Sequence, residues 1–380
     1  MKILHICLAS AFTERMTYQE NFLSTENTKA GHDVTIISDC YKYENGRKIP
    51  TDPEEKILED GTRLIRLKYD KVLNDFVSSK VRKVTNLYNV ILKIKPDVIM
   101  LHNLSGWETI SVARYKKNNP KIKLYGDSHT DRNNSGSNWF SLYILHKFFY
   151  KSIIKRAIKY FDKIFYISFE AKDFLQENYN IPENLLEFYP LGGTVISETT
   201  KKTYRKEKRE ELGIPQNDIL LCHSGKMDRK KRTYEIIENF SRLQNKNIKL
   251  ILIGVFSDDV ESKVSHLIEK DSRIKYLGWQ NSDALIKYLA ASDLYLQPGS
   301  QSATMQNALC TGTPVLFENV RSHEPYMAGN AFVINSCSEI ESVLERISNN
   351  PAVLKSMSEN AYDLARKLLD YKKLAERITK

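Results

Sequence analysis

The sequence has no run of about 18 apolar residues, which is the length that a membrane-spanning helix needs. Its five cysteines are widely scattered, with neither a CxxC pair nor a Cys/His cluster of zinc spacing. We therefore interpret the cysteines as small buried hydrophobic residues and expect no metal site. The loop after the first expected strand lacks a GxGxxG fingerprint, which argues against a dinucleotide redox cofactor.

The length and the amino-acid composition of the chain predict two soluble globular domains. At about 150 residues per domain, 380 residues suit two, and a hydrophobic fraction of 41% can fill two cores. The start of the chain, MKILHICLASAFTE, has too short an apolar stretch for a signal peptide and predicts a buried strand. We therefore expect a cytoplasmic protein. The net charge of +10 indicates an anionic partner, and nucleic acid, a phosphate-bearing substrate and a membrane surface all satisfy it.

Short apolar runs alternate with amphipathic segments along the whole chain, which is typical of β-α-β units and a mostly parallel sheet. The strands expected in the first half are 2–8, 33–38, 63–67, 97–102, 122–125 and 163–168. The pattern then restarts with strands at 218–223, 248–254, 274–277, 293–296, 314–317 and 331–334. Gly192 and Gly193, followed by a polar and charge-rich stretch, place a domain boundary at about residue 190. The sequence therefore predicts an α/β protein with two doubly wound sheets in tandem.

Ligands of open α/β sheets bind beyond the carboxyl ends of the strands, so the polar loops there are the candidate sites. The segment SGKMDRKK, residues 224–231, carries Lys226 and Lys231 around a turn, and both ammonium groups could meet one anion. Cations at a helix N-terminus oppose the helix dipole, so this cluster favours a compensating anion. A merely solvated helix start is the alternative interpretation.

A second loop, residues 298–301, opens a helix at about Ser302, whose free amide groups could bind an anion. Gly299 permits a close approach of the backbone. Neutral side chains suited to hydroxyl groups follow at Gln301, Gln306 and Asn307. Ordinary loop polarity is again the alternative.

Two loops of the first half offer titratable groups at the same edge of a sheet. One contains Asp127, His129 and Asp131, and a histidine beside two carboxylates at a strand end is a candidate catalytic group, with a structural histidine as the alternative. The loop after the first strand contributes Ser10, Thr13, Glu14 and Arg15. In the second half, the segment 321–330 carries His323 and Glu324, or is an ordinary polar loop.

The segment 138–163 predicts a strongly amphipathic helix. A basic row contains Lys147, Lys151, Lys155 and Lys159. An apolar row about 200° away contains Leu145, Phe149, Ile153 and Ala157. The helix either packs on its own sheet with its lysines in water, or rests on an anionic lipid surface with Trp139, Phe140 and Phe148 as anchors.

Several of these segments resemble the family 4-like, or group 1, glycosyltransferases of GT-B fold, and the resemblance covers nearly the whole chain. MKILHICL, TYQENFL and GHDVTIIS are similar to the family's first strand, helix and second strand, and NALCTGTPVLF to its Glu-Ala-Met-Ala-Cys-Gly-x-Pro-Val segment. SGKMDRKK is similar to the motif in which a basic residue after glycine and a lysine five positions later hold the donor diphosphate, here Lys226 and Lys231. His129 resembles the family's strand-end histidine that faces the donor sugar, and Glu324 the glutamate of a Pro-Glu-Ile-Val-x-Asp-Gly segment.

This resemblance implies two facing Rossmann-like domains with a nucleotide-sugar cleft between them. Residues 1–189 are expected to form the acceptor-side domain, with a C-terminal helix at 367–380 packing back on it, and residues 190–366 the donor domain. The implied catalytic residues are His129, Lys226 and Lys231. The implied donor-binding residues are Gly225, Gly299, Ser300, Gln301, Ser302, Ala303, Thr304, Gln306, Asn307 and Glu324. The acceptor-side residues are Ser10, Thr13, Glu14, Arg15, Asp127 and Asp131.

One departure from the family pattern concerns two glutamates eight positions apart around the donor helix. Gly299 stands at the position of the first, which contacts the sugar, and Asn307 at the position of the second, which holds the ribose diol. The implied reaction is retaining transfer from a UDP- or GDP-linked sugar to a hydroxyl of a lipid-linked glycan in surface polysaccharide synthesis. No cofactor is expected, and no metal, consistent with the absence of an Asp-x-Asp motif.

A catalytically weak GT-B protein that binds a partner or a glycan and a nucleotide-sugar epimerase are the alternatives. Nucleic-acid binding is not expected, because no recognised module is present. The expected location is cytoplasmic, including the inner face of the cytoplasmic membrane.

Overall fold

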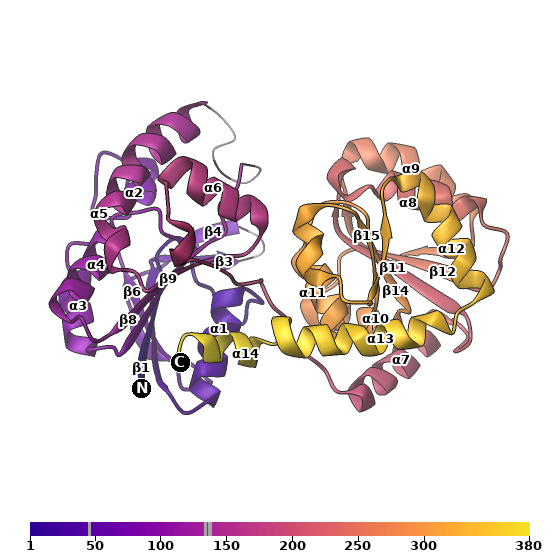
Figure 1. Ribbon diagram of the computed structural model, residues 1–380, viewed down its shortest axis with the longest axis horizontal. Coiled ribbons are helices and arrows are strands. Elements are labelled where there is room, and N and C mark those ends of the chain that lie inside the picture. Colours follow the sequence, from indigo (N-terminus) through magenta and orange to yellow (C-terminus); the bar gives the residue numbers. More distant parts are fainter. Residues whose placement is uncertain (45–46, 133–134, 136–138) are drawn as a thin grey trace. The chain divides into compact units, whose positions relative to one another are not determined.

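The computed structural model describes residues 1–44, 47–132, 135 and 139–380, and these residues form two compact units (Figure 1). Unit 1 comprises Met1–Pro190 and Tyr371–Lys380, and unit 2 comprises Leu191–Asp370. Each unit is a parallel sheet with helices on its faces, which confirms the α/β class.

Unit 1 is built on an eight-stranded sheet in the order β10-β9-β8-β7-β1-β2-β6-β5, whose strand pairs are parallel apart from the edge pair β5–β6. The strands of this sheet are β1 (Lys2–Cys7), β2 (Asp33–Asp39), β5 (Glu55–Ile57), β6 (Arg63–Leu67), β7 (Val98–Leu101), β8 (Lys123–Ser128), β9 (Lys163–Tyr166) and β10 (Leu186–Phe188). A separate hairpin pairs β3 (Tyr41–Glu44) with β4 (Arg47–Pro50).

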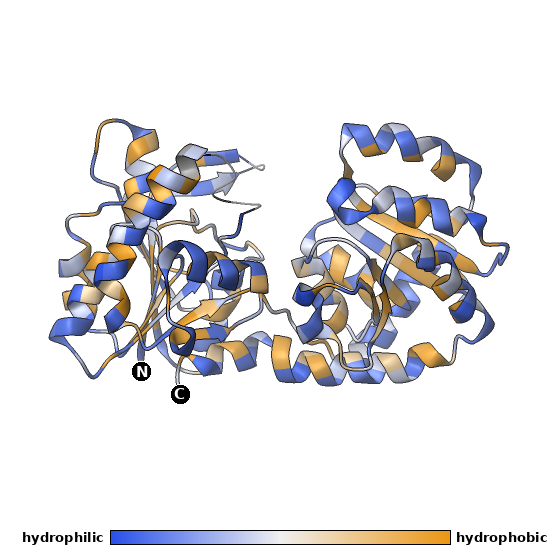
Figure 2. Cartoon of the chain, turned by 45° about the horizontal axis from the view of Figure 1, so that its top comes forward, coloured by the Kyte–Doolittle hydropathy of each residue, from blue (hydrophilic) through white to orange (hydrophobic). Residues whose placement is uncertain are grey.

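The helices of unit 1 cover both faces of this sheet. They are α1 (Gln19–Lys29), α2 (Asp75–Val81), α3 (Leu87–Ile94), α4 (Glu108–Asn118), the π-helix η1 (Phe140–Tyr150), α5 (Lys151–Ala157), α6 (Phe169–Tyr179), α14 (Tyr371–Arg377) and the short 3-10 helices η2 (Ile158–Tyr160) and η3 (Glu183–Leu185). Successive residues of β1 face opposite ways, so Leu4 joins a core with α3 to α6, and Ile3 joins a second core with α1 and α14. Burying both faces explains why the strands are almost wholly apolar (Figure 2).

Unit 2 repeats this architecture with six parallel strands in the order β13-β12-β11-β14-β15-β16. The strands are β11 (Ile219–Met227), β12 (Ile248–Phe256), β13 (Ile274–Tyr276), β14 (Leu294–Gln297), β15 (Val315–Glu318) and β16 (Ala331–Ile334). The helices are α7 (Glu198–Leu212), α8 (Thr233–Arg242), α9 (Asp258–Lys270), α10 (Ser282–Ala291), α11 (Ala303–Cys310), α12 (Ile340–Asn349) and α13 (Val353–Leu364). Shorter turns are the 3-10 helices η4 (Arg229–Lys231), η5 (Arg321–Tyr326) and η6 (Cys337–Glu339) and the π-helix η7 (Ala365–Leu369).

All twelve expected strands are present, but several are longer than the apolar pattern indicates, and two of these extensions affect site residues. β8 continues to Ser128, so Asp127 lies on a strand rather than in a loop. β11 continues to Met227 because it pairs with β12 over nine residues, so Lys226 lies on the strand end. The edge strands β5 and β10 and the hairpin β3–β4 were not expected, since they are short and half exposed.

The expected helix at 138–163 is divided into η1, α5 and η2, and Asn138 lies outside the described residues. The apolar row is confirmed as the packed face, since Ile153 and Ala157 are buried. The expected helix at 367–380 is also divided: Ala365–Leu369 belongs to unit 2 and α14 to unit 1.

Helix α14 is held on unit 1 by both apolar and polar contacts. The Tyr371 ring stacks on Phe22 of α1 at 4.4 Å. The Tyr189 hydroxyl donates to the Leu374 carbonyl at 2.6 Å, and Arg377 pairs with Glu187 at 2.5 Å. The last residues of the chain are thus part of the core of unit 1. Among the described residues, no helix combines the length and the apolar character that crossing a bilayer demands.

Each sheet reverses its strand order once, and these switch points locate the candidate sites. In unit 1 the reversal lies between β1 and β7, and in unit 2 between β11 and β14. Loops on either side of a switch point diverge, which leaves a crevice beyond the carboxyl ends of the strands.

Candidate functional site

Two loops of unit 2 meet at its switch point. A Cβ atom on Gly299, in the loop after β14, would lie 2.1 Å from the carbonyl oxygen of Lys230 in η4, so only glycine fits this position. The N–H of Ser300 donates to the same oxygen at 3.1 Å. Lys231 Nζ donates back to the Ser300 carbonyl at 3.1 Å. The two loops therefore form one joined surface.

Lys231 passes over a pair of glycines at the ends of β11 and β12. Its Cε would lie 4.0 Å from a Cβ on Gly225, whose φ is +119°. Gly225 pairs in register with Gly254, where φ is +133° and a Cβ would lie 1.9 Å from the Gly225 oxygen. Burial lowers the pKa of Lys231 to about 8, against the opposing effect of Asp228. An ammonium group that has lost part of its hydration in this way gains most from an anionic partner.

Helix α11 begins beside these loops. Ser302 is its N-cap: its Oγ accepts from the N–H of Met305 at 3.2 Å and donates to Gln297 Oε1 at 3.1 Å. The N–H groups of Ala303 and Thr304 open the helix, where no intrahelical acceptor is available. The start of α11 and Lys231 together make an electropositive surface suited to phosphate groups.

His223, on β11 beneath this surface, is buried and neutral. Its Nδ1 lies 2.8 Å from the Leu296 carbonyl, and its Nε2 lies 2.9 Å from the Thr233 hydroxyl. A carbonyl can only accept, so Nδ1 carries the proton and Nε2 accepts. Burial lowers the pKa of His223 to about 4, opposed by the Leu296 carbonyl and assisted by Lys231.

In unit 1, a buried hydrogen-bonded chain ends at Asp127. Asn27 Oδ1 lies 3.1 Å from His5 Nε2, and His5 Nδ1 lies 3.0 Å from His102 Nε2. His102 Nδ1 lies 2.6 Å from Asp127 Oδ2, and the other carboxylate oxygen accepts from the Asn103 N–H at 2.8 Å. The chain crosses from α1 through β1 to the ends of β7 and β8.

The side-chain amide of Asn27 determines which ring nitrogens carry protons along this hydrogen-bonded chain. Its amide nitrogen donates to the Ala375 carbonyl of α14 at 3.2 Å, so its oxygen faces His5 Nε2, which must donate. A neutral His5 then accepts at Nδ1, and His102 donates through both ring nitrogens. Burial opposes charge on His102 and Asp127, yet each partner stabilises the other: the pKa of His102 is raised and that of Asp127 lowered. The result is a buried imidazolium–carboxylate pair at the switch point.

His129 lies beside this pair. Its side chain is 39% exposed, and its Nε2 lies 3.9 Å from Asp127 Oδ2. Asp127 is thus shared between a buried histidine and one that solvent and ligands can reach.

Comparisons with known proteins agree with this geometry. Residues 204–364, within unit 2, match the family model "Glycosyl transferases group 1". The chain is similar to alpha-galactosylglucosyldiacylglycerol synthase of Streptococcus pneumoniae, with 23% identity over 168 residues, which are 42% of this chain and 44% of the relative. The match therefore spans less than half the length of that curated relative.

Solved structures share the architecture over the full chain. HepE of Anabaena in complex with UDP has a TM-score of 0.68 at 14% identity, covering 100% of this chain and 98% of its own. WaaG, a glycosyltransferase involved in lipopolysaccharide biosynthesis, has a TM-score of 0.64 at 17% identity, covering 100% of both chains. Residues 204–364 are thus similar to the group 1 glycosyltransferases, and the whole chain has the GT-B fold of these solved structures.

In unit 2, the structure brings together five of the donor-side residues that the sequence predicts. These are Gly225, Lys231, Gly299, Ser300 and Ser302. Lys226 is exposed at the end of β11, and its side chain makes no hydrogen bond or ion pair with the described residues. Glu324 is exposed in η5, and Asn307 is half-buried with its Oδ1 close to Gly193.

The two glutamines near α11 differ from the expectation that they face hydroxyl groups of a donor. Gln306 is fully buried: its Oε1 accepts from the Gly192 N–H at 2.8 Å, and its Nε2 donates to the Tyr326 hydroxyl at 3.1 Å. Its hydrogen bonds are used within the fold, because the backbone at the start of unit 2 needs an acceptor there. Gln301 also donates to Tyr326, at 2.8 Å, while its Oε1 is buried without a hydrogen-bond partner among the described residues.

The first loop of unit 1 is held mostly by contacts with the segments around β3 and β5 of the same unit. Thr13 is buried, donating to the Ala11 carbonyl and accepting from the Tyr43 N–H. Glu14 pairs with Lys56 at 2.6 Å, and the exposed Arg15 pairs with Glu59. The other acceptor-side candidates, Ser10 and Asp131, are half-buried next to the ends of β1 and β8.

Sequence analysis missed His5, His102, His223 and Gly254 as site residues. The signal was present for His102, because it directly follows the buried strand β7 at the switch point. The partners of His5 and His223 come from distant segments, which no local pattern indicates. Among the described residues, no group of three or more His, Cys, Asp or Glu side chains could hold a metal ion.

Proposed function

We propose that this protein is a glycosyltransferase that moves a sugar, with retention, from a UDP- or GDP-linked donor to a hydroxyl of a lipid-linked acceptor in the synthesis of cell-surface glycans. The observation that carries the donor half is the joined surface of Lys231, Ser300 and the start of α11 at the switch point of unit 2. UDP is bound in the HepE structure, and WaaG is described as acting in lipopolysaccharide biosynthesis. The Streptococcus relative is named as a glycolipid synthase, which supports a lipid acceptor.

In this proposal, the protein stabilises the charge that develops on the leaving diphosphate. Lys231, the helix start at Ser302 and the more exposed Lys226 supply positive charge, and no metal is required. We assign His129 to the transfer step, as the family resemblance implies, and the buried pair of His102 and Asp127 orients it through the 3.9 Å contact. Retention follows from the family resemblance, and the anomeric configuration of the product, measured by NMR, tests it.

A catalytically weak binding protein is the second candidate, because Gly299 and Asn307 stand where the family pattern has glutamates. Transfer or hydrolysis of a donor by the purified protein excludes it. Release of an altered sugar nucleotide without acceptor would instead indicate an epimerase.

Thermal unfolding in the presence of UDP, GDP, ADP and CMP tests the donor half. We expect UDP or GDP to raise the melting temperature, since a ligand at about 100 times its dissociation constant adds about 2.7 kcal/mol of stability. The same titration of Lys231→Ala should give a smaller shift. Absence of a shift with all four nucleotides would contradict the proposal.

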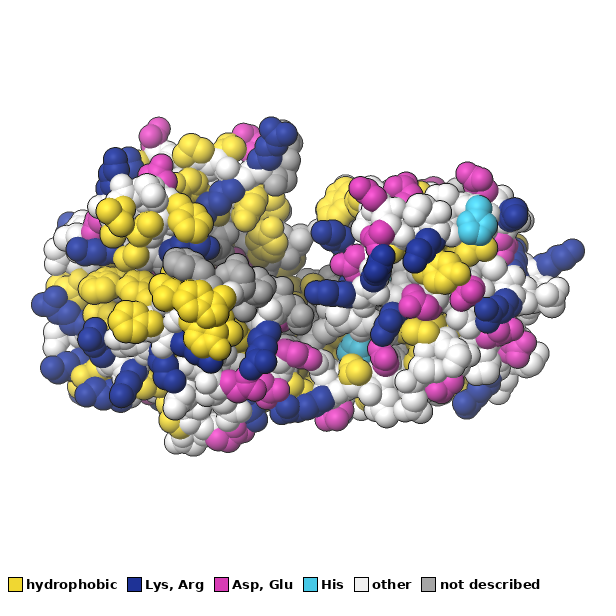
Figure 3. Space-filling model, turned by 90° about the horizontal axis from the view of Figure 1, so that it is seen from above, with side chains coloured by type: hydrophobic (Ala, Val, Ile, Leu, Met, Phe, Trp, Pro, Cys, Tyr) yellow, Lys and Arg dark blue, Asp and Glu magenta, His cyan; other side chains and the backbone are white. Residues whose placement is uncertain are grey.

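The proposed lipid-linked acceptor predicts that the protein contacts an anionic membrane. Helix η1 carries an aromatic–basic surface of exposed side chains: Trp139, Tyr143, Ile144, Lys147 and Phe148. Lys147 lies 4.6 Å over the Tyr143 ring. Figure 3 shows hydrophobic side chains gathered among Lys and Arg on unit 1. Aromatic anchors beside basic groups suit the interface of an anionic bilayer.

We expect the protein to sediment with vesicles containing phosphatidylglycerol at low salt, and much less with pure phosphatidylcholine. Phe148→Ser and Lys147→Glu should each reduce binding several-fold, because one removes an anchor and the other reverses a charge worth about 1 kcal/mol near the surface. Lys117→Glu on α4, also exposed, is the matched control. Equal sedimentation of the η1 variants and the wild type would place the membrane contact elsewhere.

A further inference from the structure

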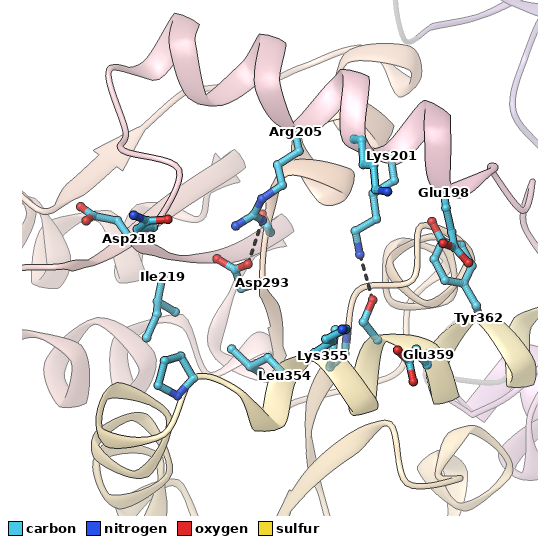
Figure 4. Close-up of a pocket in the computed structure, with 16 residues that line it drawn as sticks. Glu198, Lys201, Arg205, Asp218, Ile219, Asp293, Leu354, Lys355, Glu359 and Tyr362 are labelled. Carbon is cyan, nitrogen blue, oxygen red and sulfur yellow. Dashed lines mark hydrogen bonds and ion pairs between the residues drawn. The ribbon is translucent and has the colours of Figure 1, made fainter.

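A cavity of about 590 Å³ lies in unit 2 among residues of α7, α13 and the loops before β11, β14 and β15 (Figure 4). Ile219 begins β11 and Asp293 directly precedes β14, whereas Lys231 and Ser300 follow the opposite ends of these strands. The cavity therefore opens at the amino end of the sheet and is separate from the proposed donor surface.

One end of this cavity holds the ammonium group of Lys201. Its Nζ donates to the Gly312 carbonyl at 2.6 Å and to Ser358 Oγ at 3.2 Å. Among the described residues, no carboxylate forms an ion pair with it. Burial lowers the pKa of Lys201 to about 8, because its neighbours compensate the charge incompletely.

Tyr362 closes the same end and has an unused hydroxyl group. Its side chain is 4% exposed, and its buried hydroxyl has no hydrogen-bond partner among the described residues. Gly312 makes room for its ring, since a Cβ there would lie 2.2 Å from it. A buried hydroxyl without a partner is costly, so Tyr362 lacks an acceptor, and the Lys201 ammonium, 5.6 Å over the same ring, favours a negatively charged one.

Further along the wall, two guanidinium groups share one carboxylate. Arg205 and Arg209 share the single carboxylate of Asp293, at 2.8 and 2.5 Å. Asp218, at the other end, pairs with Lys249 at 3.6 Å. Glu198, Glu359, Lys202 and Lys355 are exposed at the opening.

We propose that this cavity binds a small phosphate-bearing organic molecule, with its phosphate on Lys201 and Tyr362. The phosphate accepts from the Lys201 ammonium and the Tyr362 hydroxyl, whereas the Ser358 hydroxyl already donates to the Gly312 carbonyl. The volume exceeds that of a phosphate ion, and Ile219, Pro314 and Leu354 offer an apolar wall for an organic part such as a sugar ring.

Isothermal titration of the full chain with glucose 6-phosphate and with inorganic phosphate tests this proposal. The measurements are made in a Lys231→Ala background, so that the donor surface contributes little, with sodium chloride matched for ionic strength. We expect glucose 6-phosphate to bind at least several-fold more tightly than inorganic phosphate. Adding Lys201→Met should weaken binding at least tenfold and Tyr362→Phe several-fold, while Lys206→Met, an exposed lysine of α7, should leave it unchanged.

Affinity should also fall as the pH rises from 7 to 9, since Lys201 loses its proton over this interval. Lys201→Met removes a buried charge and Tyr362→Phe keeps the ring, so both variants should fold. Equal affinity in Lys201→Met and its background, or equal affinity for both probes, overturns the proposal. Neither outcome depends on whether the protein transfers a sugar.

Discussion

Lys231→Ala is expected to reduce kcat/KM for the donor by about 10- to 100-fold. The side chain provides a charge-assisted contact of about 1.5 to 3 kcal/mol at a point where the leaving diphosphate gains charge. Its ammonium group is already held at the joined loops by the Ser300 carbonyl, so little ordering remains to be done on binding. Lys226→Ala, which removes a more exposed charge of the same motif, is expected to have an effect in the same direction and of similar range.

The pH profile distinguishes a role in charge stabilisation from a role in folding. Lys231 carries its proton below about pH 8, so kcat/KM should fall as the pH rises through this value. Lys231→Arg should recover much of the rate and move the alkaline limb upward, because arginine stays charged. Lys270→Ala, an exposed lysine of α9, is the matched control. Wild-type kinetics in Lys231→Ala would remove this lysine from the mechanism.

Much of the fold could be predicted because it depends on local pattern. Most buried parallel strands are rich in apolar residues, and twelve strands were predicted from this pattern. The edge strand β5 and the hairpin β3–β4 are half exposed and mixed in character, so they have no such signature. The ends of β8 and β11 were missed for another reason: the strands continue as polar residues whose pairing depends on their neighbours.

The sequence indicated which loops form the candidate site, but not which residues of these loops contact one another. Glycine at position 299 marks a close approach, and the structure identifies the partner as the Lys230 carbonyl. A glutamate side chain does not fit at position 299 while the two loops are in contact. The absence of the family's first glutamate is therefore a consequence of this loop contact. Gln306 illustrates the limit, since its polar group suggested a ligand while its partners are Gly192 and Tyr326.

Mild acid is expected to destabilise both units, because each contains a fully buried neutral histidine. The pKa of His5 in unit 1 is lowered to about 3 and that of His223 in unit 2 to about 4, in both cases chiefly by burial. The unfolded chain binds these protons near pH 6.5, and the folded chain does not until pH 3 to 4. Stability is therefore full above about pH 7 and is lost as the pH falls through this window. At about 1.4 kcal/mol per pH unit and proton, each histidine lowers the free energy of unfolding by about 2 kcal/mol between pH 7 and 5.

Urea unfolding at pH 7, 6 and 5 measures this loss. His5 and His223 together contribute about 4 kcal/mol if the units unfold together, and about 2 kcal/mol each within their own units if they do not. His146 adds in the same direction, since its pKa is also lowered to about 4 by burial. His223→Gln should abolish the loss of unfolding free energy that His223 causes in unit 2, because a glutamine amide can donate to the Leu296 carbonyl and accept from the Thr233 hydroxyl without titrating. His266→Gln, on the exposed face of α9, is the control and should keep the wild-type slope. The same loss of stability in His223→Gln and wild type would show that other groups govern the acid response.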